Sequence, residues 1–149
     1  MLAEIDDIEE LSKLRILQQK DDWQEEYPNK DEELYVNTKK YLEEHLNNDI
    51  FIFIERQDEK IVATCGIQII QYMPQCVESG LEGYICDVFT LEEYRRKGIQ
   101  TRLIDECLNF SKDRGLIKIR ISTDSEDGIS LYKKFGFEFD ELMMKKFLK

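Results

Sequence analysis

The sequence has 149 residues, 42% of them hydrophobic, which is the length of one globular domain with enough apolar residues for a single core. We therefore expect one domain over residues 1–149. A net charge of −11 argues against general binding of nucleic acid or anionic membranes, because both would repel most of the surface. The chain has no long apolar run and no readable targeting signal, which favours a cytoplasmic protein.

The amino-terminal third predicts two amphipathic helices. The first is expected to begin after Asp6 and Asp7 and to end near Gln19. The second is expected over about residues 30–47, with Asn29 as its cap. Between them, residues 21–28 are polar and aromatic, which is typical of a functional loop. The apolar positions of the two helices are Ile8, Leu11, Leu14 and Leu17, then Leu34, Thr38, Tyr41, Leu42 and Leu46.

Strands dominate the middle of the chain. Residues 51–54 and 61–70 predict a hairpin, and residues 83–89 predict a third strand. A helix begins near Thr101, and Gly115 is placed to end it.

The last part of the chain predicts a strand, a helix and closing strands. Residues 117–121 alternate isoleucine with basic side chains, a pattern typical of a strand with one buried face. A short helix over residues 129–135 should stop at Gly136, and residues 137–147 offer one or two closing strands. The order of all these elements predicts an α/β fold with a mixed sheet and helices on both faces.

The cysteines and the histidine give metal and disulfide chemistry little support. Cys65, Cys76, Cys86 and Cys107 have spacings that match neither a zinc site nor a redox pair. His45 has no second ligand nearby in the sequence. We expect reduced thiols and no bound metal.

One segment departs from the acidic character of the chain. Residues 95–120 carry 8 basic and 3 acidic side chains, which suggests a small anionic ligand. Within it, Arg95-Arg96-Lys97-Gly98-Ile99-Gln100-Thr101 follows a strand and opens a helix, an arrangement whose free N–H groups bind phosphate. Gly98 lets the backbone approach an anion closely. Taken alone, the segment is equally compatible with a solvated basic turn.

Two segments resemble the signature segments of the GNAT superfamily of N-acetyltransferases. They are Val88-Phe89-Thr90-Leu91-Glu92-Glu93-Tyr94-Arg95-Arg96-Lys97-Gly98-Ile99 and Ser125-Glu126-Asp127-Gly128-Ile129-Ser130-Leu131-Tyr132-Lys133-Lys134-Phe135-Gly136-Phe137, in the family's order and spacing. The resemblance extends over residues 83–137. It implies a central mixed, mostly antiparallel sheet with helices on both faces. It also implies transfer of the acetyl group of acetyl-CoA to an amine.

The resemblance implies how acetyl-CoA is held. The family's Arg/Gln-x-x-Gly-x-Gly/Ala loop maps onto Arg95, Gly98 and Gln100. Gln100 departs from the family's small residue, so its side chain must turn away from the phosphates or add an amide contact. Ser125 stands where many relatives have an asparagine that faces the cofactor. The implied cofactor-binding residues are Val88, Phe89, Thr90, Arg95, Arg96, Lys97, Gly98, Ile99, Gln100, Thr101 and Ser125.

Tyr132 resembles the family tyrosine that protonates the departing CoA thiolate. A phenol with a pKa of about 10 can supply a proton to a thiolate with a pKa of about 8.5 within hydrogen-bond reach. By position alone, Tyr132 would be interpreted as a core aromatic residue on a short helix. The resemblance also implies direct transfer with no covalent enzyme intermediate, so that binding aligns the amine with the thioester.

The general base and the acceptor site are less defined. Asp87 is the favoured base, Glu82 is an alternative beside the same strand, and Glu25 or Glu26 are weaker candidates. In the family, the region between the first two helices walls the acceptor pocket. Aromatic and acidic walls suit a cationic amine of a small molecule or a peptide. The implied substrate-binding residues are Trp23, Glu25, Glu26 and Tyr27, with Tyr35 as a further candidate.

Three functions are compatible with these features. The first is an active N-acetyltransferase, and the second is a non-catalytic acyl-CoA-binding or regulatory module. The third is a structural or partner-binding protein, since a fold does not determine a function. Strand edges in the carboxy-terminal half allow a homodimer without requiring one.

Overall fold

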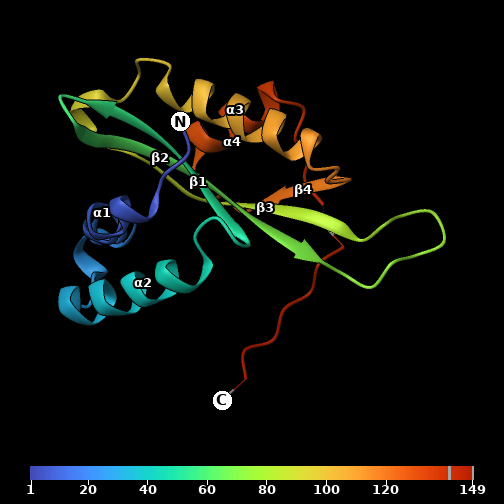
Figure 1. The fold of residues 1–149 in the computed structure, drawn as a ribbon, viewed down its shortest axis with the longest axis horizontal. Coiled ribbons are helices and arrows are strands. Elements are labelled where there is room, and N and C mark those ends of the chain that lie inside the picture. The colour runs from blue at the N-terminus through green and yellow to red at the C-terminus, as the bar shows by residue number, and fades with distance from the viewer. Residues whose placement is uncertain (141, 149) are drawn as a thin grey trace.

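The computed structural model describes residues 1–140 and 142–148, which form a four-stranded mixed sheet with helices on both faces (Figure 1). The strands lie in the order β1, β2, β3, β4. The pairs β1–β2 and β2–β3 are antiparallel, and β3–β4 is parallel. The expected mixed, mostly antiparallel sheet is confirmed. The strands are β1 (Ile50–Gln57), β2 (Lys60–Gln71), β3 (Leu81–Thr90) and β4 (Lys118–Ile121).

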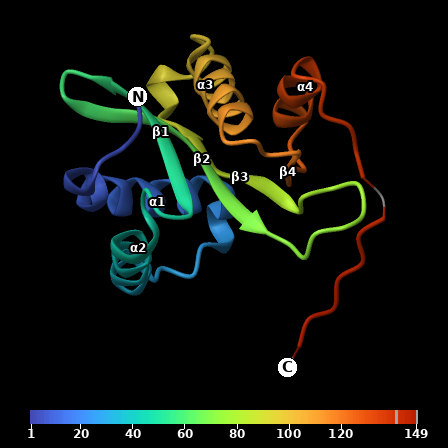
Figure 2. The same ribbon diagram turned by 45° about the vertical axis from the view of Figure 1, so that its right-hand side comes forward.

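The helices cover the sheet in two pairs (Figure 2). The helices α1 (Ile8–Trp23) and α2 (Asp31–His45) lie on one face, and α3 (Ile99–Asp113) and α4 (Glu126–Lys134) lie on the other. The α3 helix connects β3 to β4, so these elements form a parallel β-α-β unit. No helix in the described part of the chain is long and apolar enough to cross a membrane.

The core lies on both faces of the sheet, against α1 and α2 on one side and α3 on the other. Residues 50–54 of β1 and 61–63 of β2 are buried, and Leu103, Ile104 and Cys107 of α3 are fully inaccessible. Burial of one large apolar side chain stabilises the fold by about 1.5–3 kcal/mol. This core holds the long strand β3 firmly against β2.

The first two helices differ in detail from the prediction. The α1 helix continues to Trp23. Its buried face contains Leu14 and then Gln18, so Leu17 is 46% exposed rather than part of the core. The expected cap at Asn29 is wrong, because Asn29 lies outside α2 in the left-handed conformation with a φ of 54°. Three acidic residues in the first turn of α2 favour the helix through its dipole instead.

The carboxy-terminal part also differs. The predicted closing strands are absent from residues 137–140 and 142–148. Side-chain contacts hold the start of this segment instead, with the Phe137 ring 6.0 Å from the Tyr132 ring and Asp140 paired to Arg120 at 3.0 Å. The strand β4 is less buried than expected, because it stands at the edge of the sheet, and Ile117, just before it, is 45% exposed.

Candidate functional site

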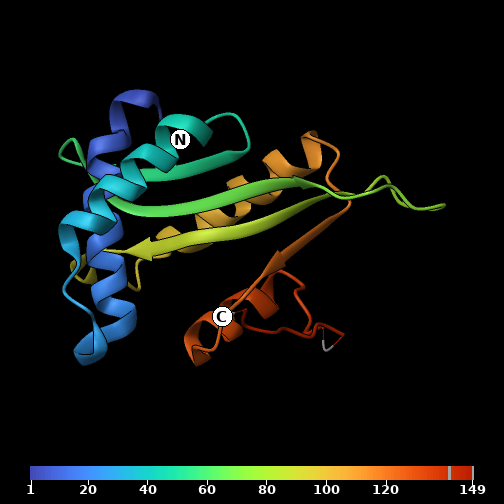
Figure 3. The same ribbon diagram turned by 90° about the horizontal axis from the view of Figure 1, so that it is seen from below.

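The strands β3 and β4 separate at one end, as Figure 3 shows. Their pairing runs only from Glu82 opposite Lys118 to Ile85 opposite Ile121. Residues 86–90 of β3 continue beyond the last pair. Within the described chain, the β4-facing edge of this strand end therefore has no strand partner.

A β-bulge marks the start of this strand end. Gly66 pairs with Cys86 and Thr64 with Phe89, so β3 has one more residue than β2 in this interval. Asp87 adopts a φ of 50°, because the extra residue bends the strand. The bulge turns the backbone of β3 where it leaves β4.

Side chains from three elements hold three consecutive carbonyl groups at this bulge. The Thr64 hydroxyl of β2 donates to the Asp87 carbonyl at 2.7 Å. The Gln18 amide of α1 lies 3.5 Å from the Val88 carbonyl, and the Gln100 amide of α3 donates to the Phe89 carbonyl at 2.8 Å. The strand end is thus anchored from the sheet and from both helical layers.

The loop before α3 presents free backbone N–H groups. Gly98 has a φ of 74° and Arg96 a φ of 60°, and Ile99 is buried and anchors the first turn. None of the N–H groups from 96 to 101 has a hydrogen-bond partner among the described residues. A Cβ atom on Gly98 would meet nothing within 4 Å, so the space in front of the loop is open. This arrangement fits a pyrophosphate.

The three cations of the loop have different surroundings. Arg95 is engaged within the protein: its Nε donates to the Thr90 carbonyl at 2.9 Å, and its guanidinium pairs with Asp21 of α1 at 2.8 Å. Arg96 and Lys97 are exposed, and Lys97 Nζ lies 5.2 Å from the centre of the Tyr94 ring. Arg95 therefore shapes the loop, and the other two leave positive charge at its surface.

The Gln100 side chain turns into the protein. Its Nε2 lies 3.0 Å from the Thr64 carbonyl, 2.8 Å from the Phe89 carbonyl and 2.9 Å from Thr90 Oγ1. Of the two orientations that the sequence left open, the structure has the one directed away from the loop. The long side chain does not obstruct the N–H groups.

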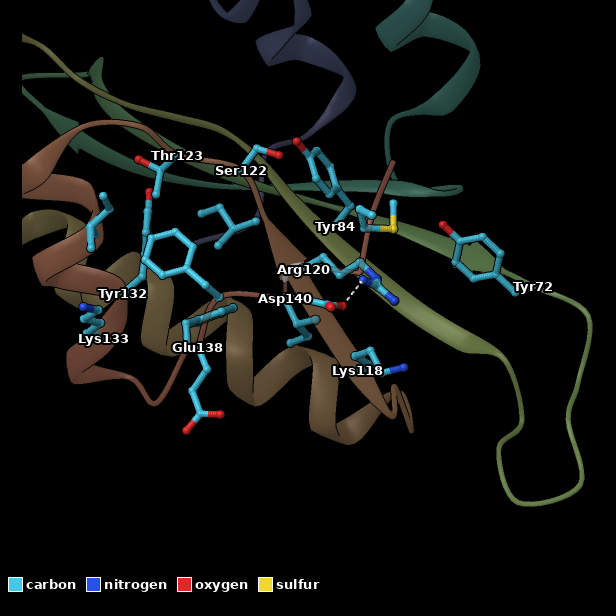
Figure 4. A pocket seen from close by; sticks show the side chains of 16 residues that line it. Tyr72, Tyr84, Lys118, Arg120, Ser122, Thr123, Tyr132, Lys133, Glu138 and Asp140 are labelled. Atoms are coloured by element: carbon cyan, nitrogen blue, oxygen red, sulfur yellow. Dashed lines mark hydrogen bonds and ion pairs between the residues drawn. The ribbon is translucent and has the colours of Figure 1, made fainter. Parts of the chain in front are cut away.

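Tyr132 lies on α4 beside a cavity of about 720 Å³ between β4, α4 and the carboxy-terminal segment (Figure 4). Figure 4 shows Tyr132 next to Thr123 at one end of this cavity. Tyr132 is only 7% exposed. Burial, with a smaller contribution from nearby Cys65, raises the pKa of the Tyr132 phenol to about 12. The phenol therefore stays protonated at neutral pH.

Asp87 lines a second cavity of about 380 Å³ between α1, α2 and the sheet. Its carboxylate is 20% exposed and lies 3.7 Å from Arg15 of α1. Burial raises the pKa of Asp87 to about 6, although the Arg15 charge and the Thr64 hydroxyl oppose this shift. A carboxylate with a pKa near neutrality is suited to exchange protons. Tyr84 lines both cavities and so lies between Asp87 and Tyr132.

Glu82 is engaged in ion pairs and is less suited than Asp87 to act as a general base. Its side chain is 9% exposed and pairs with Arg120 at 3.0 Å and with Lys118 at 3.3 Å. Burial acts to raise the pKa of Glu82, but the hydrogen bonds from Arg120 and Lys118 outweigh it and lower the pKa. This carboxylate is held ionised by two cations and is a poor proton acceptor.

The remaining predicted site residues lie away from these cavities. Ser125 caps α4, because its hydroxyl accepts the Gly128 N–H at 3.0 Å. The segment with Trp23, Glu25, Glu26 and Tyr27 spans the end of α1 and a 3₁₀ turn, Gln24–Glu26, and none of the four lines either cavity. Trp23 is 53% exposed.

The thiols beside the site are not poised for nucleophilic attack. Burial, together with the neighbouring Asp87, raises the pKa of Cys86 to about 12. Hydrogen bonding with Cys107 and burial raise the pKa of Cys65. Because the thiolate is the nucleophilic form, these residues are inert. Cys65 and Cys107 are core residues as predicted, whereas Cys86 is half-buried.

Four residues of the site were missed by the sequence interpretation: Arg15, Gln18, Thr64 and Tyr84. Gln18 carried a local signal, because it follows Leu14 by four residues and so lies on the same face of the helix. Arg15 carried the same signal, because it follows Leu11 by four residues. Tyr84 carried none, since its place between the two cavities depends on the tertiary fold.

Comparisons with known proteins agree with this geometry. The profile of the Acetyltransferase (GNAT) family matches residues 14–137. The chain is 39% identical to N-alpha-acetyltransferase 30 of Schizosaccharomyces pombe over 59 residues, which are 38% of this chain and 39% of that protein. It is 36% identical to N-alpha-acetyltransferase 50 of Danio rerio over 61 residues, which are 39% of this chain and 36% of that protein. The matched stretches thus span well under half of these relatives.

A solved structure extends the similarity to nearly the whole chain. It is a predicted acetyltransferase with acetyl-CoA from Clostridium acetobutylicum, with a TM-score of 0.83 and 29% identity. The superposition covers 98% of this chain and 93% of that one. The similarity therefore includes α1 and α2 as well as the loop before α3.

Proposed function

Since this chain belongs to the GNAT acetyltransferase family, we propose that it transfers the acetyl group of acetyl-CoA directly to a primary amine of a small molecule or a peptide. One observation carries the proposal. The end of β3 separates from β4 near a loop with free N–H groups, and the pKa values of two titratable side chains beside the site, Asp87 and Tyr132, are raised.

The loop residues bind the anionic end of acetyl-CoA. The N–H groups from 96 to 101 point at the pyrophosphate, and Arg96 and Lys97 add positive charge. Gly98 leaves the approach open. When bound, acetyl-CoA supplies a thioester that is ready to acylate an amine, and the unpaired edge of residues 86–90 holds its pantetheine arm.

Asp87 acts as the general base. It accepts the proton of the incoming ammonium group, directly or through one water molecule. The Arg15 guanidinium at 3.7 Å keeps more of this carboxyl ionised near pH 7 than burial alone would allow. Its pKa of about 6 makes it unprotonated in most molecules at pH 7.

Tyr132 acts as the general acid. Its phenol keeps its proton because burial raises the pKa to about 12, and it delivers this proton to the departing sulfur. The inert thiols of Cys65 and Cys86 favour direct transfer over an acyl-enzyme. Alignment of the amine with the thioester is then the main task of the protein.

The cavity beside Asp87 accepts the amine. Its walls are mostly apolar, with Leu11, Leu42, Ile50 and Ile52 around the carboxylate. An amine attached to one apolar group fits such walls, because its body is desolvated while its nitrogen faces Asp87. The name N-alpha-acetyltransferase of two relatives supports a peptide amino terminus as this acceptor. Trp23, Glu25, Glu26 and Tyr27 would then contact only an acceptor that extends beyond the cavity.

The test measures thiol release from acetyl-CoA with a panel of small amines and short peptides. We expect the Tyr132→Phe variant to release thiol about a hundred-fold more slowly, while calorimetry shows its CoA affinity unchanged. CoA binding without thiol release from any acceptor would favour the non-catalytic binding module. No heat on titration with millimolar CoA would contradict both functions.

A further inference from the structure

The Gln100 amide joins three segments of the site at one point. Three acceptors surround its Nε2 within 3.0 Å: the carbonyls of Thr64 and Phe89 and the hydroxyl oxygen of Thr90. They belong to β2 and to the end of β3, whereas Gln100 itself lies in the first turn of α3. One side chain thus connects α3, the helix that follows the phosphate-binding loop, to the end of β3, where the thioester would bind.

The chemistry of these contacts fixes the orientation of the amide. The opposite orientation would place the Gln100 oxygen against two carbonyl oxygens, which repel it. In the observed orientation, Gln100 Oε1 is buried and has no hydrogen-bond partner among the described residues. An unmade buried hydrogen bond is unfavourable, so the contacts of the nitrogen must hold this side chain in place.

Gln100 lies within the loop that carries the free N–H groups, so its side-chain contacts also affect that loop. Gln100 follows Gly98 by two residues, and its own backbone N–H is one of the free groups of the loop. Its side chain therefore sets the distance between those N–H groups and Phe89, where β3 has already left β4.

We propose that Gln100 is a positioning residue that locks the phosphate loop to the end of β3, so that both ends of acetyl-CoA meet one rigid surface. The inference rests on the proposed function. It assigns a role to the position at which the chain departs from the small residue of its family. A small residue there would leave the carbonyls of Thr64 and Phe89 without this donor.

The test compares Gln100→Met with Gln71→Met. Methionine keeps the length of the side chain and removes the amide. Gln71, at the end of β2, is a matched control, because its Nε2 also donates to two backbone carbonyls, those of Tyr72 at 2.7 Å and Ser79 at 2.9 Å. We measure CoA affinity by calorimetry, the KM values of acetyl-CoA and amine separately, and amide hydrogen exchange without ligand.

We expect Gln100→Met to weaken CoA binding and to raise the KM of acetyl-CoA about ten-fold, with the KM of the amine unchanged. Exchange over residues 86–90 should accelerate without ligand, and Gln71→Met should alter none of these values. If Gln100→Met does not fold, Gln100→Ala removes the same amide with a residue that favours helix.

Two failures are distinguishable. Unchanged CoA affinity and unchanged exchange in the Gln100 variant, with a wild-type protein that binds CoA, would overturn this inference alone. A wild-type protein that does not bind CoA would overturn the proposed function and this inference with it.

Discussion

The two halves of the site, the loop before α3 and the cavity beside Asp87, consist of different kinds of chemical group. The loop at residues 95–101 offers free backbone N–H groups that come from one continuous segment. The cavity beside Asp87 is assembled from side chains of α1, α2 and the sheet. A backbone site tolerates changes of side chain but depends on its conformation, whereas a side-chain site depends on individual functional groups and their charges. Substitutions should therefore affect the two halves in different ways.

The largest effect is expected at Asp87. The Asp87→Asn variant keeps the shape of the cavity but cannot accept a proton, so kcat should fall at least about a hundred-fold while CoA affinity is unchanged. Steady-state kinetics with calorimetry measure both quantities. Asp105→Asn, on the exposed side of α3, is the control and should be unaffected. If Asp87→Asn lost CoA affinity to the same extent as kcat, the two halves of the site would not be independent.

The same variant should be more stable than the wild type at neutral pH. The folded-state pKa of about 6 exceeds the ordinary value of 3.8, so the folded protein retains the proton, and stability is lost as the pH rises from about 4 to 6. Asparagine avoids this loss. We expect Asp87→Asn to raise the free energy of unfolding by about 1–3 kcal/mol at pH 7 and by almost nothing below pH 4. Urea denaturation at both pH values checks this.

The loop should respond to backbone conformation. Gly98 and Gly115 have φ values of 74° and 73°, and a Cβ atom on either would meet nothing within 4 Å. Alanine at either position should therefore cost about 1–2 kcal/mol of stability through the same backbone strain. Only Gly98→Ala should weaken CoA binding, by about ten-fold, because only there does the strain act on the backbone that carries the free N–H groups. Equal CoA affinities in the two variants would contradict a backbone site at the loop.

The smallest effect is a shift of the pH profile. Arg15→Gln removes the charge that lowers the pKa of Asp87, so the acid limb of kcat/KM should move to higher pH by about one unit. Activity should fall most at pH 6–7 and least at pH 9. Arg102→Gln, which breaks a surface pair with Glu55 at 3.3 Å, should leave the profile unchanged. If the acid limb does not shift, its pKa belongs to a group other than Asp87.

The sequence interpretation succeeded where local pattern decides structure. The loop from Arg95 to Thr101 could be recognised because a strand, a glycine and a helix start follow one another in the chain. It could not foresee the ion pairs of Glu82, because the partners Lys118 and Arg120 belong to a strand that becomes its neighbour only through parallel pairing. It failed at Leu17 for a similar reason, since packing against the sheet selected Gln18 for the buried face.

By itself, the sequence determined the order of helices and strands from α1 to α4 and the loop that opens α3, because hydrophobic period, glycine placement and helix ends act over a few residues. Only the tertiary structure decided that the pKa of Asp87 is raised and where the Gln100 side chain points. Both depend on groups from distant parts of the chain: burial against α1 and α2 raises the pKa of Asp87 despite the Arg15 charge, and the carbonyls of Thr64 and Phe89 orient Gln100. A charge or a hydrogen bond acts through space, and its partner is known only once the chain has folded.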